Sequence, residues 1–304
     1  MTRLLTGLEL SVSSARMVQI CRERNIWRLV GSVEVPFAPG TMDMSNRSRN
    51  IQEPDQFLHA IRGAMKKMNG KVGRVGLSLP SEIIKIAVHS WDELPRSVER
   101  IHEMIAWKEK GLLPFPVEKA RTSFFRLNGM RPGKESLLVA VGSEEIIRDY
   151  EARLRSLRIE PGIVQPSAIN HLNFYSGHLP ASGVHGFLGV LDDYFAFFVF
   201  EGNNLIFYRG KRKHPLPGRF LQEIAMTIQL YQDENPGKSI GMLYIQSQTP
   251  LPDDFLSELS RECDFRTGGL DETEIVADGS GLKNARLIAC FASAIGAAQS
   301  LKES

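Results

Sequence analysis

The sequence predicts an α/β protein built from two halves of related design, with an α+β segment inserted into the first half. A group of short apolar strands begins the chain, and a second such group begins near residue 182; each group precedes amphipathic helices. Hydrophobic residues make up 42% and charged residues 24% of the 304 residues, which is typical of globular proteins. The chain is long enough to bury a large core without disulfides.

In the first half, alternating apolar residues predict strands near residues 4–10, 15–20, 27–33 and 74–79. Between the last two, Phe57, Ile61 and Ala64 recur at helical spacing behind Pro54, which suits a first helical turn. We therefore expect a meander of three strands, a helix over residues 54–68, and a fourth strand.

The inserted segment begins with a predicted strand over residues 83–88. A helix follows, whose apolar stripe runs from Val98 to Leu112 before Pro114 and Pro116 end it. Strands are predicted over residues 122–127 and 137–141, and Ser143 caps a helix that reaches about Leu157.

The second half repeats the opening pattern, with strands over residues 187–191, 194–200 and 205–209. Helices over residues 220–231, 252–262 and 284–299 and a strand over 242–245 complete it. Phe195, Phe197 and Phe198 predict a strand buried on both faces. The small residues of the last helix predict close packing against a sheet.

Charge and cysteine usage exclude several classes of protein. Lys and Arg number 37 against 35 Asp and Glu, so nothing in the net charge of +2 favours nucleic acid or an anionic membrane. Cys21, Cys263 and Cys290 are widely separated, which is typical of a reducing compartment. Glu9 interrupts the apolar opening, so no export signal is expected, and residues 288–298 are too short to cross a membrane. These features predict a cytoplasmic location.

No pattern identifies a metal centre or a hydrolase. The seven histidines show no paired ligand spacing, and no Gly-x-Ser-x-Gly sequence occurs. The basic run from Lys211 to His214 is interpreted as a solvated turn. We therefore expect no metal and no catalytic residue of these kinds.

The opening Gly7-Leu8-Glu9-Leu10-Ser11-Val12-Ser13-Ser14-Ala15-Arg16 resembles the first phosphate-binding hairpin of the actin-like ATPases, and most of all that of the PilM family of type IV pilus assembly. That family has Gly-x-Asp-x-Gly-x-Ser-Ser-x-Lys at these positions. The segment from Met104 through Leu113-Pro114-Phe115-Pro116 is similar to the family's inserted subdomain, and so is Leu138-Val139-Ala140-Val141. The resemblance covers roughly residues 1–175.

The resemblance implies an actin-like fold of two ribonuclease-H-like halves. The first half would comprise residues 1–79 and 160–180, the inserted α+β subdomain 80–159, and the second half 181–304, with its last helix packing on the first half. Only 13 residues separate Arg209 from Glu223, where the family carries the subdomain that caps the nucleotide. That capping subdomain is therefore expected to be missing.

The resemblance also places a vestigial nucleotide site at Glu9, Ser11, Ser13, Ser14 and Arg16. Glu9 stands for the family's metal-binding aspartate, Ser11 for its glycine and Arg16 for its lysine. The second hairpin has Gly189-Val190-Leu191 in place of Asp-x-Gly, and Ser247-Gln248 replaces the Gly-Gly that meets the nucleoside. Because phosphoryl transfer needs metal and positioning groups together, these losses predict a pseudo-ATPase without catalytic residues or cofactor.

The resemblance implies a non-catalytic cytoplasmic adaptor of a type IV pilus or related secretion platform. It would bind the cytoplasmic tail of a PilN-like inner-membrane protein, contact other platform or motor proteins, and reach the membrane only through partners. Trp107 and Phe115 are candidates for the tail-binding groove, and the alternative is that both pack the small core of the subdomain.

Two other functions stay open at this point. One is an ATP-binding or ATP-hydrolysing switch in the same assembly, with ATP and Mg²⁺ held by Glu9, Ser13 and Ser14. The other is a sugar-kinase-like enzyme, which rests on analogy of fold alone.

Overall fold

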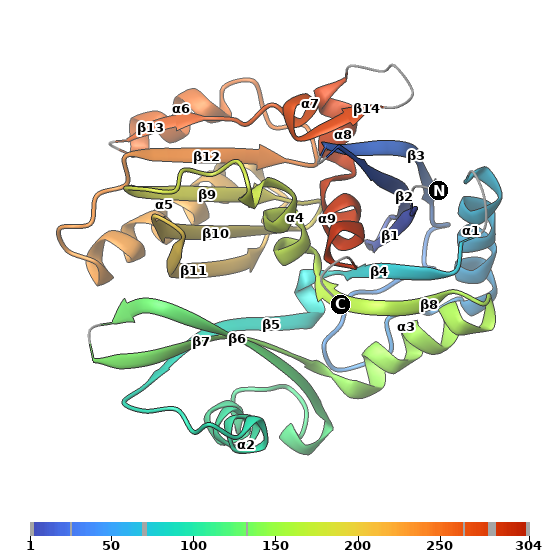
Figure 1. Ribbon diagram of the computed structural model, residues 1–304, viewed down its shortest axis with the longest axis horizontal. Coiled ribbons are helices and arrows are strands. Elements are labelled where there is room, and N and C mark those ends of the chain that lie inside the picture. The colour runs from blue at the N-terminus through green and yellow to red at the C-terminus, as the bar shows by residue number, and fades with distance from the viewer. Residues whose placement is uncertain are drawn as a thin grey trace.

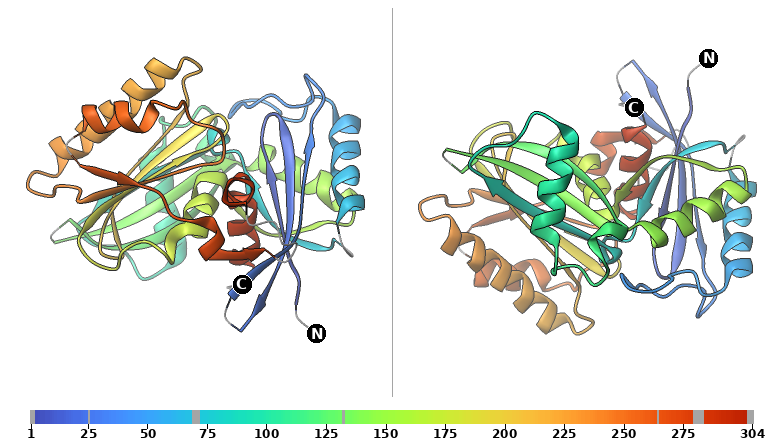
Figure 2. Two further views of the ribbon diagram at one scale, coloured as in Figure 1. Left: turned by 90° about the horizontal axis from the view of Figure 1, so that it is seen from above. Right: turned by 90° about the horizontal axis from the view of Figure 1, so that it is seen from below.

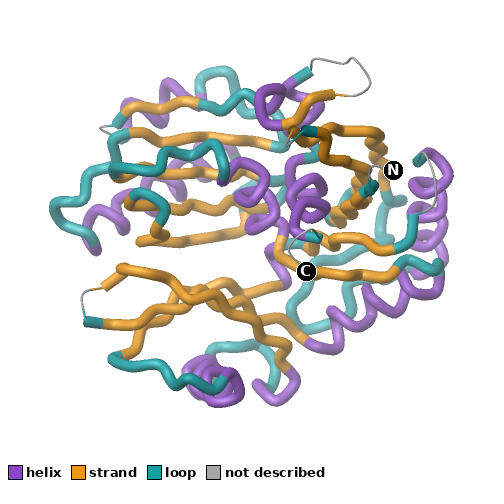
Figure 3. The backbone as a smooth tube through the Cα atoms, in the orientation of Figure 1, coloured by secondary structure: helices purple, strands orange, loops and turns teal. Residues whose placement is uncertain are grey.

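Strands of the computed structural model form a six-stranded, a five-stranded and a three-stranded sheet (Figure 1). The structure describes residues 3–24, 26–68, 72–131, 133–263, 265–278 and 284–301. Strands form the centre of both halves, and helices lie outside or between them (Figure 3).

The six-stranded sheet has the order β14-β3-β2-β1-β4-β8. Its strands are β1 (Leu5–Leu10), β2 (Ser14–Glu23), β3 (Ile26–Pro36), β4 (Arg74–Leu79), β8 (Glu160–Pro166) and β14 (Val276–Asp278). Alternation along β1 turns Leu8 and Leu10 towards helices α1 (Pro54–Lys67) and α3 (Glu144–Ser156), whereas Leu5 joins the core on the opposite face. The predicted meander, helix and fourth strand are confirmed.

The five-stranded sheet has the order β11-β10-β9-β12-β13. It comprises β9 (Val184–Val190), β10 (Tyr194–Glu201), β11 (Asn204–Arg212), β12 (Met242–Ser247) and β13 (Arg266–Gly268). Phe195 and Phe197 pack under α5 (Pro217–Glu234) and α6 (Phe255–Glu262), and Phe198 packs on the other face. All three rings are fully buried, as predicted for a strand covered on both sides.

The three-stranded sheet has the order β5-β7-β6 and belongs to the inserted segment. Its elements are the 3-10 helices η1 (Ser81–Ile83) and η2 (Val117–Lys119), β5 (Ile84–Trp91), α2 (Val98–Glu109), β6 (Ala120–Arg131) and β7 (Lys134–Ser143). Helix α2 covers one face through Ile101 and Ile105. Strands β6 and β5 also contact β11, the edge strand of the second sheet.

Helices α4 (Ser167–Ser176) and α9 (Ala292–Ser300) lie between the two larger sheets (Figures 1 and 2). The short α7 (Glu272–Ile275) and α8 (Ala285–Cys290) precede α9. A Cβ atom on Gly7, Gly76 or Gly296 would lie within 2 Å of a backbone oxygen of α9 or α4. The small residues of α9 therefore allow the helix to lie against β1 and β4, as predicted.

Three sequence predictions were wrong in detail. Strand β8 and helix α4 were missed, because Pro161 and Pro166 argue against a strand, yet β8 is an edge strand where proline is tolerated. The helix predicted over residues 284–299 breaks at Phe291, whose ψ is 7°. Helix α2 ends at Glu109, short of Leu112.

Candidate functional site

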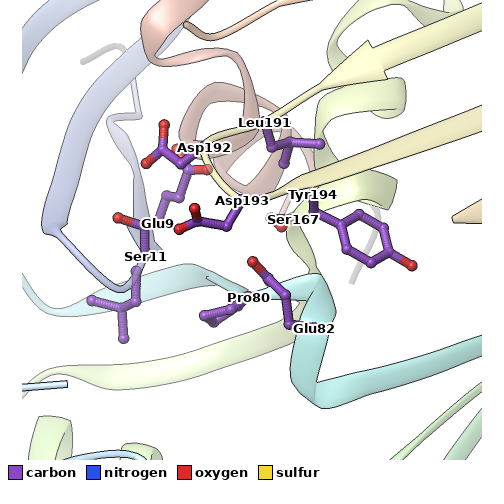
Figure 4. A pocket seen from close by; sticks show the side chains of 10 residues that line it. Glu9, Ser11, Pro80, Glu82, Ser167, Leu191, Asp192, Asp193 and Tyr194 are labelled. Carbon is purple, nitrogen blue, oxygen red and sulfur yellow. The ribbon is translucent and has the colours of Figure 1, made fainter. Parts of the chain in front are cut away.

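The turn between β1 and β2 faces the turn between β9 and β10 across the interface of the two halves (Figure 4). A cavity of about 20 Å³ lies between them, lined on one side by Glu9 and Ser11 and on the other by Asp192 and Asp193. Glu82 of η1 and Ser167 of α4 complete its wall. The cavity has room for about one water molecule, whereas ligand pockets hold several hundred cubic ångströms.

Arg16 spans the space between the two hairpins. Its Nη2 donates to both carboxylate oxygens of Asp192 at 3.0 Å, and its Nε donates to Oε1 of Glu34 on β3, also at 3.0 Å. The Arg16 side chain is 8% exposed and that of Asp192 16%. The residue at the expected lysine position therefore joins the two hairpins by a largely buried ion pair, in which one nitrogen contacts both carboxylate oxygens.

Glu9 is almost fully buried beside this ion pair. Its Oε2 accepts a hydrogen bond from Nε2 of Gln248 at 3.1 Å and lies 3.7 Å from Nη1 of Arg16. Burial raises the pKa of Glu9 to about 7, although the Arg16 charge pulls it down. The longer side chain that replaces the family's aspartate is thus held by protein groups.

The Ser11 hydroxyl accepts hydrogen bonds from two backbone amides of the first turn. Its Oγ accepts from the amide of Ser13 at 3.2 Å and from that of Ser14 at 3.1 Å. Ser14 Oγ donates to Oε1 of Glu34 at 2.7 Å. The five predicted residues do come together at one hairpin, and most of their polar groups bond to each other or to neighbouring protein groups. Nη1 of Arg16 is buried without a hydrogen-bond partner and lies 3.7 Å from Oε2 of Glu9.

Three acidic residues of the cavity, Glu82, Asp192 and Asp193, were not predicted as site residues. Burial raises the pKa of Glu82 to about 7, and the charges of Asp193 and Asp192 raise it further. The four carboxylates gather around the cavity in Figure 4, and none of the described residues that line it is basic. The sequence signals were the Asp192-Asp193 turn and the glutamate two residues after Pro80.

Two features of this arrangement are unfavourable to a bound phosphate group. The phosphates of ATP would need the turn amides that donate to Ser11, and the acidic lining would repel their charge. Among the residues that the structure describes, no group of three or more His, Cys, Asp or Glu side chains could hold a metal ion.

A larger groove runs between the inserted segment and the two halves. Its volume is about 900 Å³, and its walls come from α4, β6, the β10–β11 hairpin and the tip of the β2–β3 hairpin. Trp27, Phe125, Leu138, Ile169 and Leu172 give it an apolar lining, and Phe125 is 69% exposed.

The two sequence-derived candidates for partner binding lie elsewhere. Trp107 on α2 is 78% exposed, so the alternative that it packs the subdomain core is wrong. Phe115 is half-buried in the turn after α2. Neither residue lines the apolar groove, which sequence reasoning missed because its walls come from distant segments.

Comparison with solved structures identifies the architecture. A chain of the PilM–PilN type IV pilus biogenesis complex superposes with a TM-score of 0.83 over 99% of both chains, at 15% sequence identity. The chain has a PilM-like, actin-like fold. A Bacteroides thetaiotaomicron protein with an actin-like ATPase fold and unknown function gives a TM-score of 0.53 at 9% identity, covering 90% of this chain and 95% of that one.

The PilM-like fold is also shared with the cytoplasmic domain of EpsL, an inner-membrane component of the type II secretion system of Vibrio cholerae. That match has a TM-score of 0.50 at 13% identity and covers 83% of this chain and 84% of that one. No protein-family model and no curated protein sequence matches the chain. Within the described residues, no helix has the length and apolar character needed to span a bilayer.

Proposed function

We propose that the protein is a non-catalytic cytoplasmic adaptor of a type IV pilus or related secretion platform, which binds the cytoplasmic tail of a PilN-like inner-membrane protein. The observation that carries the proposal is the superposition on the PilM–PilN complex over 99% of both chains. The protein would reach the membrane through this partner and would also contact other platform or motor proteins.

The cleft supports an adaptor over an enzyme. Arg16 bonds to Asp192 across the two hairpins and Ser11 Oγ accepts from a turn amide, so protein groups use contacts that a phosphate would need. Strand β11 connects to α5 through residues 213–216 alone, which leaves no room for a capping subdomain at this point of the chain. The ion pair between the hairpins holds the halves together without a nucleotide. Glu9, Ser11, Ser13, Ser14 and Arg16 are then a structural remnant of a nucleotide site.

The apolar groove supports tail binding. Its volume of about 900 Å³ lies within the range of ligand sites, and an exposed phenylalanine at its rim offers contact area. The exposed Trp107 and the half-buried Phe115 remain candidates for a second contact on the inserted subdomain.

Binding of a labelled PilN-like tail peptide, measured by fluorescence anisotropy, tests the proposal. Phe125→Glu should weaken binding about tenfold or more, because charge at an apolar contact is costly. Met226→Glu on α5 is the matched control, since Met226 is 71% exposed and lies outside the groove. Loss of binding in Trp107→Ala but not in Phe125→Glu would place the tail on α2, and failure of the folded wild type to bind any such tail would refute the proposal.

A thermal melt with and without Mg²⁺-ATP separates the adaptor from an ATP-binding switch. A ligand at 100 times its dissociation constant adds about 2.7 kcal/mol of stability. We expect no shift for the wild type. A clear rise in melting temperature that Glu9→Ala abolishes would instead support the switch.

A further inference from the structure

A second groove lies between the inserted segment and the second half, separate from the apolar groove. Its volume is about 680 Å³, and it shares no lining residue with the apolar groove among those the structure describes. One wall is formed by residues 88–90 of β5 and the other by residues 206–209 of β11.

Both walls are edge strands. Strand β5 ends the three-stranded sheet and β11 ends the five-stranded sheet, so each has a neighbouring strand on one side within the described part of the chain. An edge strand presents backbone donors and acceptors that an extended peptide can pair with. Each wall therefore belongs to a strand with one edge that no described strand pairs, although parts of β5 and β6 already contact β11.

The groove is cationic. Lys108, Lys134, Arg209 and Lys238 line it, against the single acid Glu234. This concentration of positive charge stands out in a chain whose net charge is only +2.

Two of these cations are not neutralised by a carboxylate. Arg209 is half-buried and forms no ion pair with any described residue, whereas Lys134 pairs with Asp92 and Lys238 pairs with Glu201. Nζ of Lys108 donates to the carbonyl oxygen of Ser90 at 3.4 Å and lies 5.0 Å from the Trp91 ring centroid, which leaves its charge available.

We propose that this cationic groove binds an acidic, extended peptide segment of a protein partner. The peptide would add as a strand beside β5 or β11, and its acidic side chains would pair with Arg209 and Lys108. Charge complementarity selects the acidic partner, and the edge strands select the extended conformation. The proposal does not depend on the proposed role of the apolar groove.

The same lysines could serve only to keep the edge strands from pairing with other chains. In that case no peptide would bind, acidic or otherwise. Peptide binding therefore distinguishes the two roles.

The test uses a short fluorescein-labelled peptide of alternating glutamate and valine, and a second peptide with lysine in place of glutamate. The acidic peptide should bind the full chain and weaken as salt rises, and the basic peptide should not bind. Arg209→Gln and Lys108→Glu should each weaken binding about tenfold, since a charged pair in a partly desolvated groove is worth 1–2 kcal/mol. Lys66→Glu on the exposed face of α1 is the matched control and should bind as the wild type does.

Hydrogen exchange distinguishes strand pairing from binding by charge alone, because only a paired strand protects backbone amides. Bound peptide should slow exchange of amides in residues 88–90 or 206–209, because a new strand protects them. The proposal is overturned if the folded protein does not bind the acidic peptide, if Lys66→Glu weakens binding as much as Arg209→Gln, or if binding leaves both strands unprotected.

Discussion

Replacing Glu9 by glutamine should remove the part of the pH dependence of stability that arises from the Glu9 carboxyl group. A pKa raised from 4.5 to about 7 means that the folded state binds a proton that the unfolded state has released between these pH values. The contribution to stability is full below pH 4.5 and is lost as pH rises towards 7. Each pKa unit corresponds to about 1.4 kcal/mol, so the rise is worth about 3 kcal/mol.

Urea denaturation at pH 5 and pH 8 measures this effect. Between these values the stability of Glu9→Gln relative to the wild type should increase by about 2.5 kcal/mol, because the glutamine does not titrate. Glutamine also keeps an acceptor for Gln248 Nε2. Glu103→Gln, at an exposed position of α2, is the control and should follow the wild-type profile. A difference between Glu9→Gln and the wild type that is the same at both pH values would refute the assignment of a buried, protonated Glu9.

Three further predictions concern single contacts. Arg16→Met should cost about 3 kcal/mol of unfolding free energy at pH 8, since it leaves the buried Glu9 and the partly buried Asp192 without their cation. A double variant with Glu9→Gln should lose less than the sum of the single changes, and additive losses would contradict the coupling. Gly296→Ala should lower the free energy of unfolding by about 2 kcal/mol or more, because its Cβ would lie 1.9 Å from a backbone oxygen. Gly63→Ala in α1 is the control: its Cβ would have no atom within 4 Å, so in the same urea melts it should raise that free energy by up to about 1 kcal/mol. Glu109→Gln should cost about 2 kcal/mol in the same melts, because it removes the charge from the hydrogen bonds that the buried Glu109 accepts from the partly exposed Lys85 and from His89. Burial alone would raise the pKa of Glu109, but the hydrogen bonds to His89 and Lys85 outweigh burial and lower the pKa below its usual value. The stability that ionised Glu109 contributes is therefore lost as pH falls, whereas that of Glu9 is lost as pH rises.

Much of the fold could be predicted because the strands and helices of each half have regular patterns of apolar residues. Alternation in β1 and β10 and helical spacing in α1 are set by neighbours in the sequence. Strand β8 could not be predicted, since its prolines are tolerated only because it ends a sheet. The helix break at Phe291 could not be predicted either, because no glycine or proline lies beside it; we attribute the break to packing between the halves.

The sequence predicted where the candidate site lies, but not which groups its side chains contact. The hairpin sequence placed Glu9 and Arg16 together, yet the partner that decides the chemistry, Asp192, lies 176 residues further along the chain. Both grooves were missed for the same reason, because β5, β6, α4 and β11 meet only in three dimensions. The exposure of Trp107 was also undecided from the sequence, since Trp107 lies within the predicted range of the apolar stripe but is not one of its positions.

The position of α9 constrains how the chain can fold during synthesis. The helix fills the face of the first sheet opposite α1, although it follows β1 by some 280 residues. Until residues 292–300 have left the ribosome, Leu5, Val18 and Ile20 have no helix to cover them. The first half should therefore stay partly open while the second half is made, and it should depend on chaperones that shield exposed strands during that interval.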